Sequence, residues 1–145
     1  MNAQKFTQKS LEALQAAQSI AIQYQNQQIE QAHLAYALAD QEGGLNPELL
    51  QKLNAEPSRF IQACEQAIGR IPRVSGPGRE QGKVYISQDV DAALNAAQAQ
   101  ADHMKDEYVS VEHVFLGLIE RANPAMKGVF EQFGIRKDAF LTALQ

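Results

Sequence analysis

The feature that most constrains this chain is an internal repeat. Sliding the sequence against itself by 80 positions aligns the two halves without a gap. Identities are few, but the apolar positions keep the same phase in both halves, as expected of one packing unit present twice. Chance similarity between two helical stretches is the alternative. The matched pairs include Thr7–Ser87, Ala13–Ala93, Leu14–Leu94, Ile29–Val109, His33–His113, Leu38–Leu118 and Phe60–Phe140.

Each half predicts four helices. In the first half, apolar residues over 11–24 recur at the three-to-four spacing of a buried helix face. Proline after a capping residue is typical of a helix start, and glycine of a helix end. The expected features of the first half are an N-cap at Thr7, a turn over 26–29, a helix over 31–41, an N-cap at Asn46 and a helix start at Pro57.

The second half follows the same plan, with Ser87 and Ser110 as expected N-caps. Between the halves, residues 71–84 hold proline and glycine at a density that supports neither helix nor strand. The sequence therefore predicts one all-α, eight-helix domain over residues 1–145. It consists of two four-helix repeats related by a pseudo-two-fold axis, about 6–70 and 85–145, joined by a Pro/Gly-rich linker.

The composition of the chain excludes several classes of partner and compartment. The net charge of −4 and the pI of about 5.3 argue against a nucleic-acid partner, because such proteins usually present basic surfaces. Cys64 is the sole cysteine, so an internal disulfide is impossible and a reducing compartment is expected. No apolar run is long enough to cross a bilayer. We therefore expect a cytoplasmic protein without a membrane partner.

The candidate motifs for cofactor and metal chemistry are incomplete. A phosphate loop ending at Lys83 would need glycine at Pro77 and Ser or Thr at Val84. Glu30-x-x-His33 matches half of a di-iron signature, but the equivalent of Glu30 is a serine, Ser110. We expect no metal and no cofactor.

The histidines and the cysteine are the remaining candidates for catalytic side chains. Structural roles are favoured for His33 and His113, which begin equivalent helices and can bond to the preceding turn. Cys64 lies on an apolar helix face, where an inert buried thiol is expected. No catalytic residues are predicted.

The turn over 106–112 is unusual because it places three acids among apolar residues that look exposed. Glu112 falls in the first turn of a helix, where a carboxylate interacts well with the dipole. Capping and solubility would explain these acids. The functional alternative is the acidic rim of an apolar peptide groove.

The order of these motifs resembles the N-terminal repeat domain of ClpB-type AAA+ disaggregases. The resemblance covers the whole chain, and the linker and the Gln-x-Gly-Gly stretch favour ClpB over ClpA or ClpC. The motifs are Asn2-x-x-Lys5-Phe6-Thr7, Asn26-x-x-Ile29-x-x-x-His33-Leu34, Gln41-x-Gly43-Gly44, Arg70-Ile71-Pro72-Arg73-Val74-Ser75-Gly76, Tyr85-Ile86-Ser87 and Asp106-x-Tyr108-Val109-Ser110-x-Glu112-His113.

The resemblance implies a domain that captures unfolded or aggregated polypeptides for a hexameric ring ATPase working with the DnaK chaperone. The polar functional positions of the family match Thr7, Asp106 and Glu112. Its apolar groove corresponds to the neighbourhood of Leu94, with Ala96 and Val109 included in the expected site. A shallower, more polar groove is expected, because Ala96, Gln100 and His113 replace the bulkier aliphatic residues of some relatives.

Two other functions remain open at this stage. One is adaptor docking of the ClpA/ClpC sort, and the other is a helical DNA-binding module, which the acidic balance disfavours. The family's ATPase modules are not encoded in this sequence, so the chain alone is not expected to hydrolyse ATP. It is expected to stop just before the linker to the first such module and to be monomeric in isolation.

Overall fold

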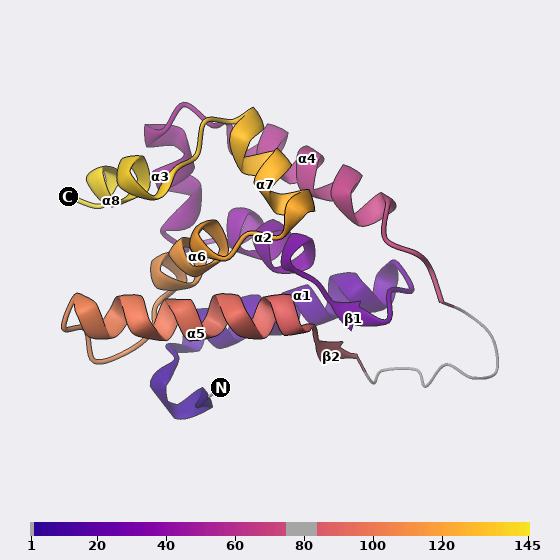
Figure 1. Ribbon diagram of the computed structural model, residues 1–145, viewed down its shortest axis with the longest axis horizontal. Helices are drawn as coiled ribbons and strands as arrows, with labels where there is room; N and C mark the ends of the chain where they lie inside the picture. Colours follow the sequence, from indigo (N-terminus) through magenta and orange to yellow (C-terminus); the bar gives the residue numbers. More distant parts are fainter. Residues whose placement is uncertain (1, 75–83) are drawn as a thin grey trace.

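The computed structural model describes residues 2–74 and 84–145. Eight α-helices make up most of this part of the chain, as predicted (Figure 1). The first repeat contains η1 (Ala3–Lys5), α1 (Gln8–Gln23), β1 (Gln28–Ile29), α2 (Gln31–Asp40), α3 (Asn46–Lys52) and α4 (Pro57–Gly69). The second contains β2 (Tyr85–Ile86), α5 (Gln88–His103), α6 (Val111–Glu120), α7 (Pro124–Gln132) and α8 (Lys137–Ala143).

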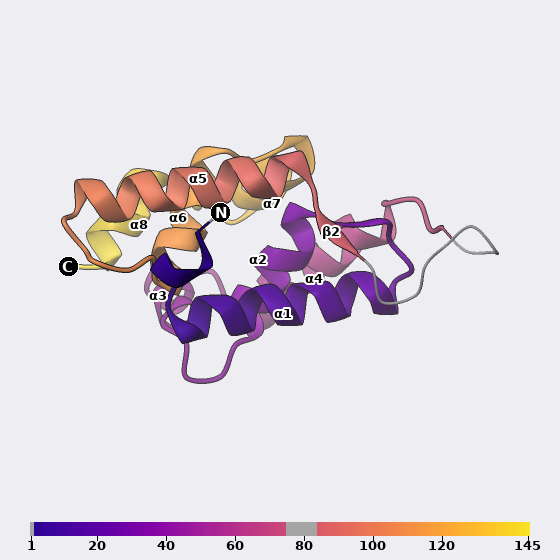
Figure 2. The same ribbon diagram turned by 90° about the horizontal axis from the view of Figure 1, so that it is seen from below.

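The two repeats lie side by side. In Figure 2, α1 to α4 fill the lower half of the view and α5 to α8 the upper half. The long helices α1 and α5 run in opposite directions along the longest axis, with η1 between them near one end (Figure 2). Equivalent loops therefore lie at opposite ends of the molecule, as a pseudo-two-fold axis requires.

Backbone geometry repeats at the same 80-residue offset. Gln25 and Lys105 both have left-handed backbones, with φ of 56° and 62°. The same is true of Asn54 and Gly134, with φ of 61° and 64°. Equivalent N-caps agree as well: the Thr7 hydroxyl accepts from Ser10 N at 3.2 Å, and that of Ser87 accepts from Val90 N at 3.1 Å. The repeat seen in the sequence is thus a structural repeat, and both predicted caps are confirmed.

Reciprocal backbone pairing joins the repeats. β1 pairs in parallel with β2, with Ile29 opposite Ile86, and Phe6 forms an isolated parallel bridge with Val109. These two pairings are equivalent under the offset, so the segment before the first helix of each repeat pairs with the loop of the other repeat. The predicted turn over 26–29 was wrong in part, because residues 28 and 29 form this strand.

The linker boundaries also need correction. Val84 was assigned to the linker, but its side chain is buried in the core. At the other end, Val74 N donates to Gln25 O at 2.8 Å, which ties the start of the linker to the end of α1. Residues 75–83, with most of the incomplete phosphate-loop motif, lie outside the described residues.

Side chains reinforce the contact between repeats. Phe115 lies between the equivalent residues Phe60 and Phe140, with ring-centroid distances of 5.8 Å and 5.1 Å. The buried Gln31 amide donates to Asp89 O and Arg121 O, both at 2.9 Å. A buried polar group with its bonds made holds the two repeats in a single arrangement.

Asn46 corrects one predicted cap. It lies inside α3, after the N-cap Leu45, and its side chain is fully buried. Its Nδ2 donates to Val111 O of the second repeat at 3.1 Å. The capping pattern in the sequence was misleading because the Asn46 amide bonds across to the second repeat, and its Oδ1 caps no helix N–H in the described structure. No helix in the described part of the chain is both long and apolar enough to cross a membrane.

Candidate functional site

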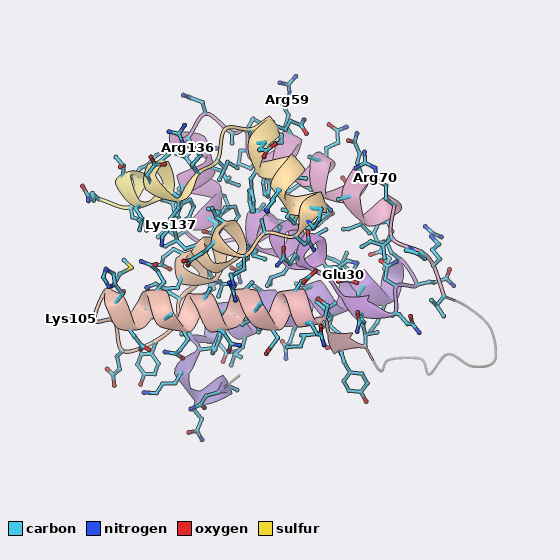
Figure 3. The ribbon with its side chains drawn as sticks, in the orientation of Figure 1. Glu30, Arg59, Arg70, Lys105, Arg136 and Lys137 are labelled. Atoms are coloured by element: carbon cyan, nitrogen blue, oxygen red, sulfur yellow. The ribbon has the colours of Figure 1, made fainter. Side chains whose placement is uncertain are left out.

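The loop between α5 and α6, residues 104–110, is the candidate site and is called the acidic loop below. Met104 and Tyr108 are 38% and 48% exposed, and they flank the exposed acids Asp106 and Glu107. Figure 3 shows Lys105 of this loop beyond one end of α5, far from Glu30 at the start of α2. The loop thus presents large apolar side chains together with carboxylates at one end of the domain.

Thr7 reaches the acidic loop through its backbone. Thr7 N donates to Val109 O at 3.0 Å, and Val109 N donates to Lys5 O at 2.7 Å. The Thr7 hydroxyl caps α1, and it also donates to Ser10 Oγ at 3.0 Å. Ser10 Oγ in turn donates to Val109 O at 3.0 Å. Thr7 therefore contributes to the local structure of the site, with its hydroxyl already engaged.

Asp106 is fixed by a buried histidine. His113 Nδ1 accepts from Ser110 N at 2.8 Å, so the ring proton of the neutral imidazole is on Nε2. That Nε2 donates to Asp106 Oδ2 at 2.8 Å. The Asp106 side chain remains 48% exposed, so one face of the carboxylate can still meet a ligand.

The first repeat has the same arrangement without the charge. His33 Nδ1 accepts from Glu30 N at 2.8 Å, and its Nε2 lies 2.8 Å from Asn26 Oδ1. Burial lowers the pKa of His33 to about 4. The structural role predicted for both histidines is confirmed, since each bonds to the turn before its helix.

Glu112 completes the polar set in the first turn of α6, where it is half-buried. Val109 lies three residues from both Asp106 and Glu112 and bonds to Thr7. The structure thus brings Thr7 to Val109, while Asp106 and Glu112 lie on either side of Val109 along the chain. The positive end of the α6 dipole stabilises the Glu112 carboxylate there.

The apolar residues expected in the groove are placed differently. Leu94 and Val109 are 1% and 0% exposed and belong to the core, so neither lines an open groove. Gln100 and His113 are buried too, so they do not make a groove shallower or more polar, as had been expected. Of the predicted apolar positions, only Ala96 is half-exposed. The physical reason is that α5 packs against α6 along the face that carries Leu94.

Three residues of the site were missed by sequence reasoning. Met104 and Tyr108 supply its exposed apolar surface, and Ser10 holds Val109 O. Tyr108 had a usable signal, an aromatic residue inside an acidic turn. Ser10 had none, because its partner lies 99 positions away in the chain.

Two other kinds of chemistry concern metal ions and the single thiol. Within that part of the chain, no group of three or more His, Cys, Asp or Glu side chains is arranged to hold a metal ion. Cys64 is fully buried, and burial raises the pKa of its thiol, which keeps it protonated and unreactive.

A hollow of about 650 Å³ is lined by residues of the α2–α3 and α3–α4 loops and of the helices beside them. Its lining includes Asp40, Glu42, Glu48 and Glu56 and none of the predicted site residues. Its α2–α3 loop bonds to the start of α1, where Lys9 Nζ donates to Glu42 O at 3.1 Å.

The family model described as the Clp repeat (R) N-terminal domain matches residues 5–133. The chain belongs to this family. Chaperone protein ClpB of Nitratidesulfovibrio vulgaris is 41% identical over 146 residues, and that of Clostridium tetani is 34% identical over 145 residues. Each match covers 100% of this chain and 17% of the relative, so the chain spans about one sixth of their length. It is thus a Clp N-domain of the ClpB type.

Solved structures show the same fold. The Hsp104 N-terminal domain of Candida albicans has a TM-score of 0.80 at 22% identity, covering 96% of this chain and 88% of that one. The ClpV N-domain in its complex with a VipB peptide has a TM-score of 0.70 at 18% identity, with the same coverage. At these identities the likeness concerns the fold alone.

Proposed function

We propose that this Clp N-domain captures unfolded or aggregated polypeptides for a ClpB-type disaggregase, binding weakly through the acidic loop. The observation that carries the proposal is the exposure of Met104 and Tyr108 next to Asp106 and Glu107. An apolar surface bordered by charged groups suits partners that expose apolar side chains. Thr7 and Glu112 extend the polar border, and the half-exposed Ala96 is an additional apolar contact.

The equivalent loop of the first repeat is a natural control. It spans residues 24–30, and its central residues 25–28 are all amides. Its one charged residue is Glu30, the N-cap of α2, which stands where the acidic loop has Ser110. Its half-buried Tyr24 corresponds to the exposed Met104. Two loops with the same backbone thus differ in charge and apolar exposure, which supports a function for the acidic loop that the fold does not itself require.

The proposal assigns the chain a place in a larger machine. The parent protein is a hexameric ATPase of the cytoplasm that works with DnaK, and the domain itself is monomeric. The 145 residues bind and present substrate, while ATP hydrolysis is a property of other modules. Weak binding is expected because the exposed surface of one loop is small compared with a stable protein interface.

NMR titration with a permanently unfolded probe tests the proposal. Reduced, carboxymethylated α-lactalbumin is added to the isotopically labelled domain. Amide shifts are expected over residues 104–112, in fast exchange, with little change in the equivalent segment 24–32. Shifts that favour the first repeat, or none at high concentration, would exclude the acidic loop as the binding site.

Paired substitutions separate charge from structure. Asp106→Asn keeps an acceptor for His113, as Asn26 does for His33, and removes only the charge. Tyr108→Ser removes apolar surface. The matched controls are Asn26→Asp and Tyr85→Ser, since Tyr85 is 70% exposed on β2, which lies at the opposite end of α5 from the acidic loop (Figure 1). Both test variants should weaken binding, and both controls should bind like the unmodified protein.

The same titration discriminates adaptor docking. A tight, stoichiometric complex with one small folded partner, together with no response to the unfolded probe, would favour the adaptor role. Weak binding to several unrelated unfolded chains would favour polypeptide capture.

A further inference from the structure

Residues 2–6, which precede α1, lie beside the acidic loop and pair with its Val109. Residues 2–5 are exposed, and Phe6 is the first buried side chain. Lys5 O accepts from Val109 N at 2.7 Å, and Phe6 forms the parallel bridge to Val109. The segment before α1 thus pairs with Val109 through one isolated parallel bridge, directly after the short helix η1. Backbone pairing is also how many domains bind extended peptides.

We propose that residues 2–6 form a displaceable strap, and that an extended segment of an unfolded polypeptide replaces the strap at Val109. This inference rests on the proposed function of the acidic loop. It adds a regulatory step, because the strap and the polypeptide compete for the backbone N–H of Val109. The segment that replaces the strap carries a large apolar side chain into the site that Phe6 fills.

The hydrogen bonds around Val109 permit this exchange. When the strap leaves, Val109 O keeps the bond from Ser10 Oγ, at 3.0 Å. Val109 N loses its acceptor, Lys5 O, although Val109 is fully buried. A buried N–H without a partner is costly. The open state therefore favours any chain that supplies a backbone carbonyl at this point.

The equivalent pairing in the other repeat is built to stay closed. Ser87 N donates to Ile29 O at 3.0 Å, as Thr7 N does to Val109 O. The residue equivalent to Ser10 is Val90, which has no hydroxyl to hold Ile29 O. The loop carbonyl at Val109 thus has donors that do not belong to the strap, Thr7 N and Ser10 Oγ.

The decisive experiment follows the strap by NMR during titration of the unmodified domain with reduced, carboxymethylated α-lactalbumin. In the bound state, the amides of residues 2–6 are expected to shift to disordered positions, while Val109 stays protected from hydrogen exchange. Loop shifts with residues 2–6 unchanged would overturn the strap and leave the proposed function standing. No shift in the loop would overturn both proposals.

Two variants measure the competition. Phe6→Ala should lower the apparent dissociation constant for the unfolded probe by about tenfold, since apparent affinity follows the open fraction. The matched change Ile86→Ala, at the equivalent position in β2, should leave it unchanged. A synthetic peptide with the sequence of residues 1–7 should compete with the probe on Phe6→Ala, and a peptide with alanine in place of its phenylalanine should not. Equal effects of the two substitutions would argue that the strap is only structural.

Discussion

The two repeats of this domain have the same backbone plan and different side-chain chemistry. Each ends its first helix in a left-handed residue and caps its second helix with a buried histidine. They differ in the partner of that histidine, which is Asn26 in one repeat and Asp106 in the other. Features common to both repeats therefore serve the fold. Features confined to the second repeat are the candidates for function.

A second difference concerns packing. In the second repeat, α5 and α6 approach so closely that a Cβ atom on Gly117 would lie 2.1 Å from Ala93 O. The residue equivalent to Gly117 is Ala37, which is accommodated at the same place in the first repeat. The pair that carries the acidic loop is thus packed more tightly than its counterpart, which provides a rigid support for the loop.

The largest expected effect is an acid sensitivity that resides in the first repeat. His33 has a pKa of about 4 in the folded protein, below its ordinary value of 6.5. The unfolded chain therefore binds a proton that the folded chain excludes between these values. Stability due to His33 is complete above pH 6.5 and is lost as the pH falls through 4, by about 3 kcal/mol in total.

Urea unfolding between pH 7 and pH 4 measures this effect. His33→Gln should reduce the slope of stability against pH, whatever its effect at pH 7. His113→Gln is the matched variant in the second repeat. An unchanged slope in His33→Gln would contradict the exclusion of a proton from the buried His33 ring.

The next effect concerns Gly117. Gly117→Ala should lower the free energy of unfolding by about 1–3 kcal/mol, because the new methyl group overlaps the Ala93 carbonyl. The reverse change in the first repeat, Ala37→Gly, should lower it by only about 1 kcal/mol, through helix propensity. Chemical denaturation of both variants tests the asymmetry. A Gly117→Ala protein as stable as the unmodified one would contradict the close approach of α5 and α6.

The smallest effect concerns the left-handed residues that end α1 and α5. Lys105→Gly and Gln25→Gly should each raise stability by less than about 1 kcal/mol, since glycine adopts a positive φ without strain. Thermal unfolding is sensitive enough to compare them. Equal gains would show that the two loops share their backbone energetics despite their different side chains, and unequal gains would show that the acidic side chains contribute.

Much of the fold was predictable because it depends on local interactions. Apolar spacing gave the helices, and the side chains of Thr7 and Ser87 cap residues three positions further on. The roles of His33 and His113 were predictable for the same reason, since each bonds to the turn just before it. The offset of 80 residues then made one repeat a check on the other.

The candidate site was predictable only in part. Its acids stand out in the sequence because the equivalent loop has amides. Leu94 was misplaced in an open groove: it is 1% exposed, although its equivalent Leu14 is half-buried. The two leucines have the same apolar phase, so the sequence alone does not distinguish their burial. Asn46 was misread as a cap because its acceptor, Val111 O, is 65 residues away.

The sequence by itself determined that this chain is a doubled helical unit, where most of its helices begin, and which loop carries charge. Only the tertiary structure decided that Phe6 pairs with Val109 and Ile86 with Ile29, and that Ser10 holds Val109 O. Helix caps and periodicity come from residues within one or two turns of each other, so they leave a local pattern. A backbone pairing between the repeats is formed by segments far apart in the chain. A single sequence contains no pattern that shows which of these distant segments meet.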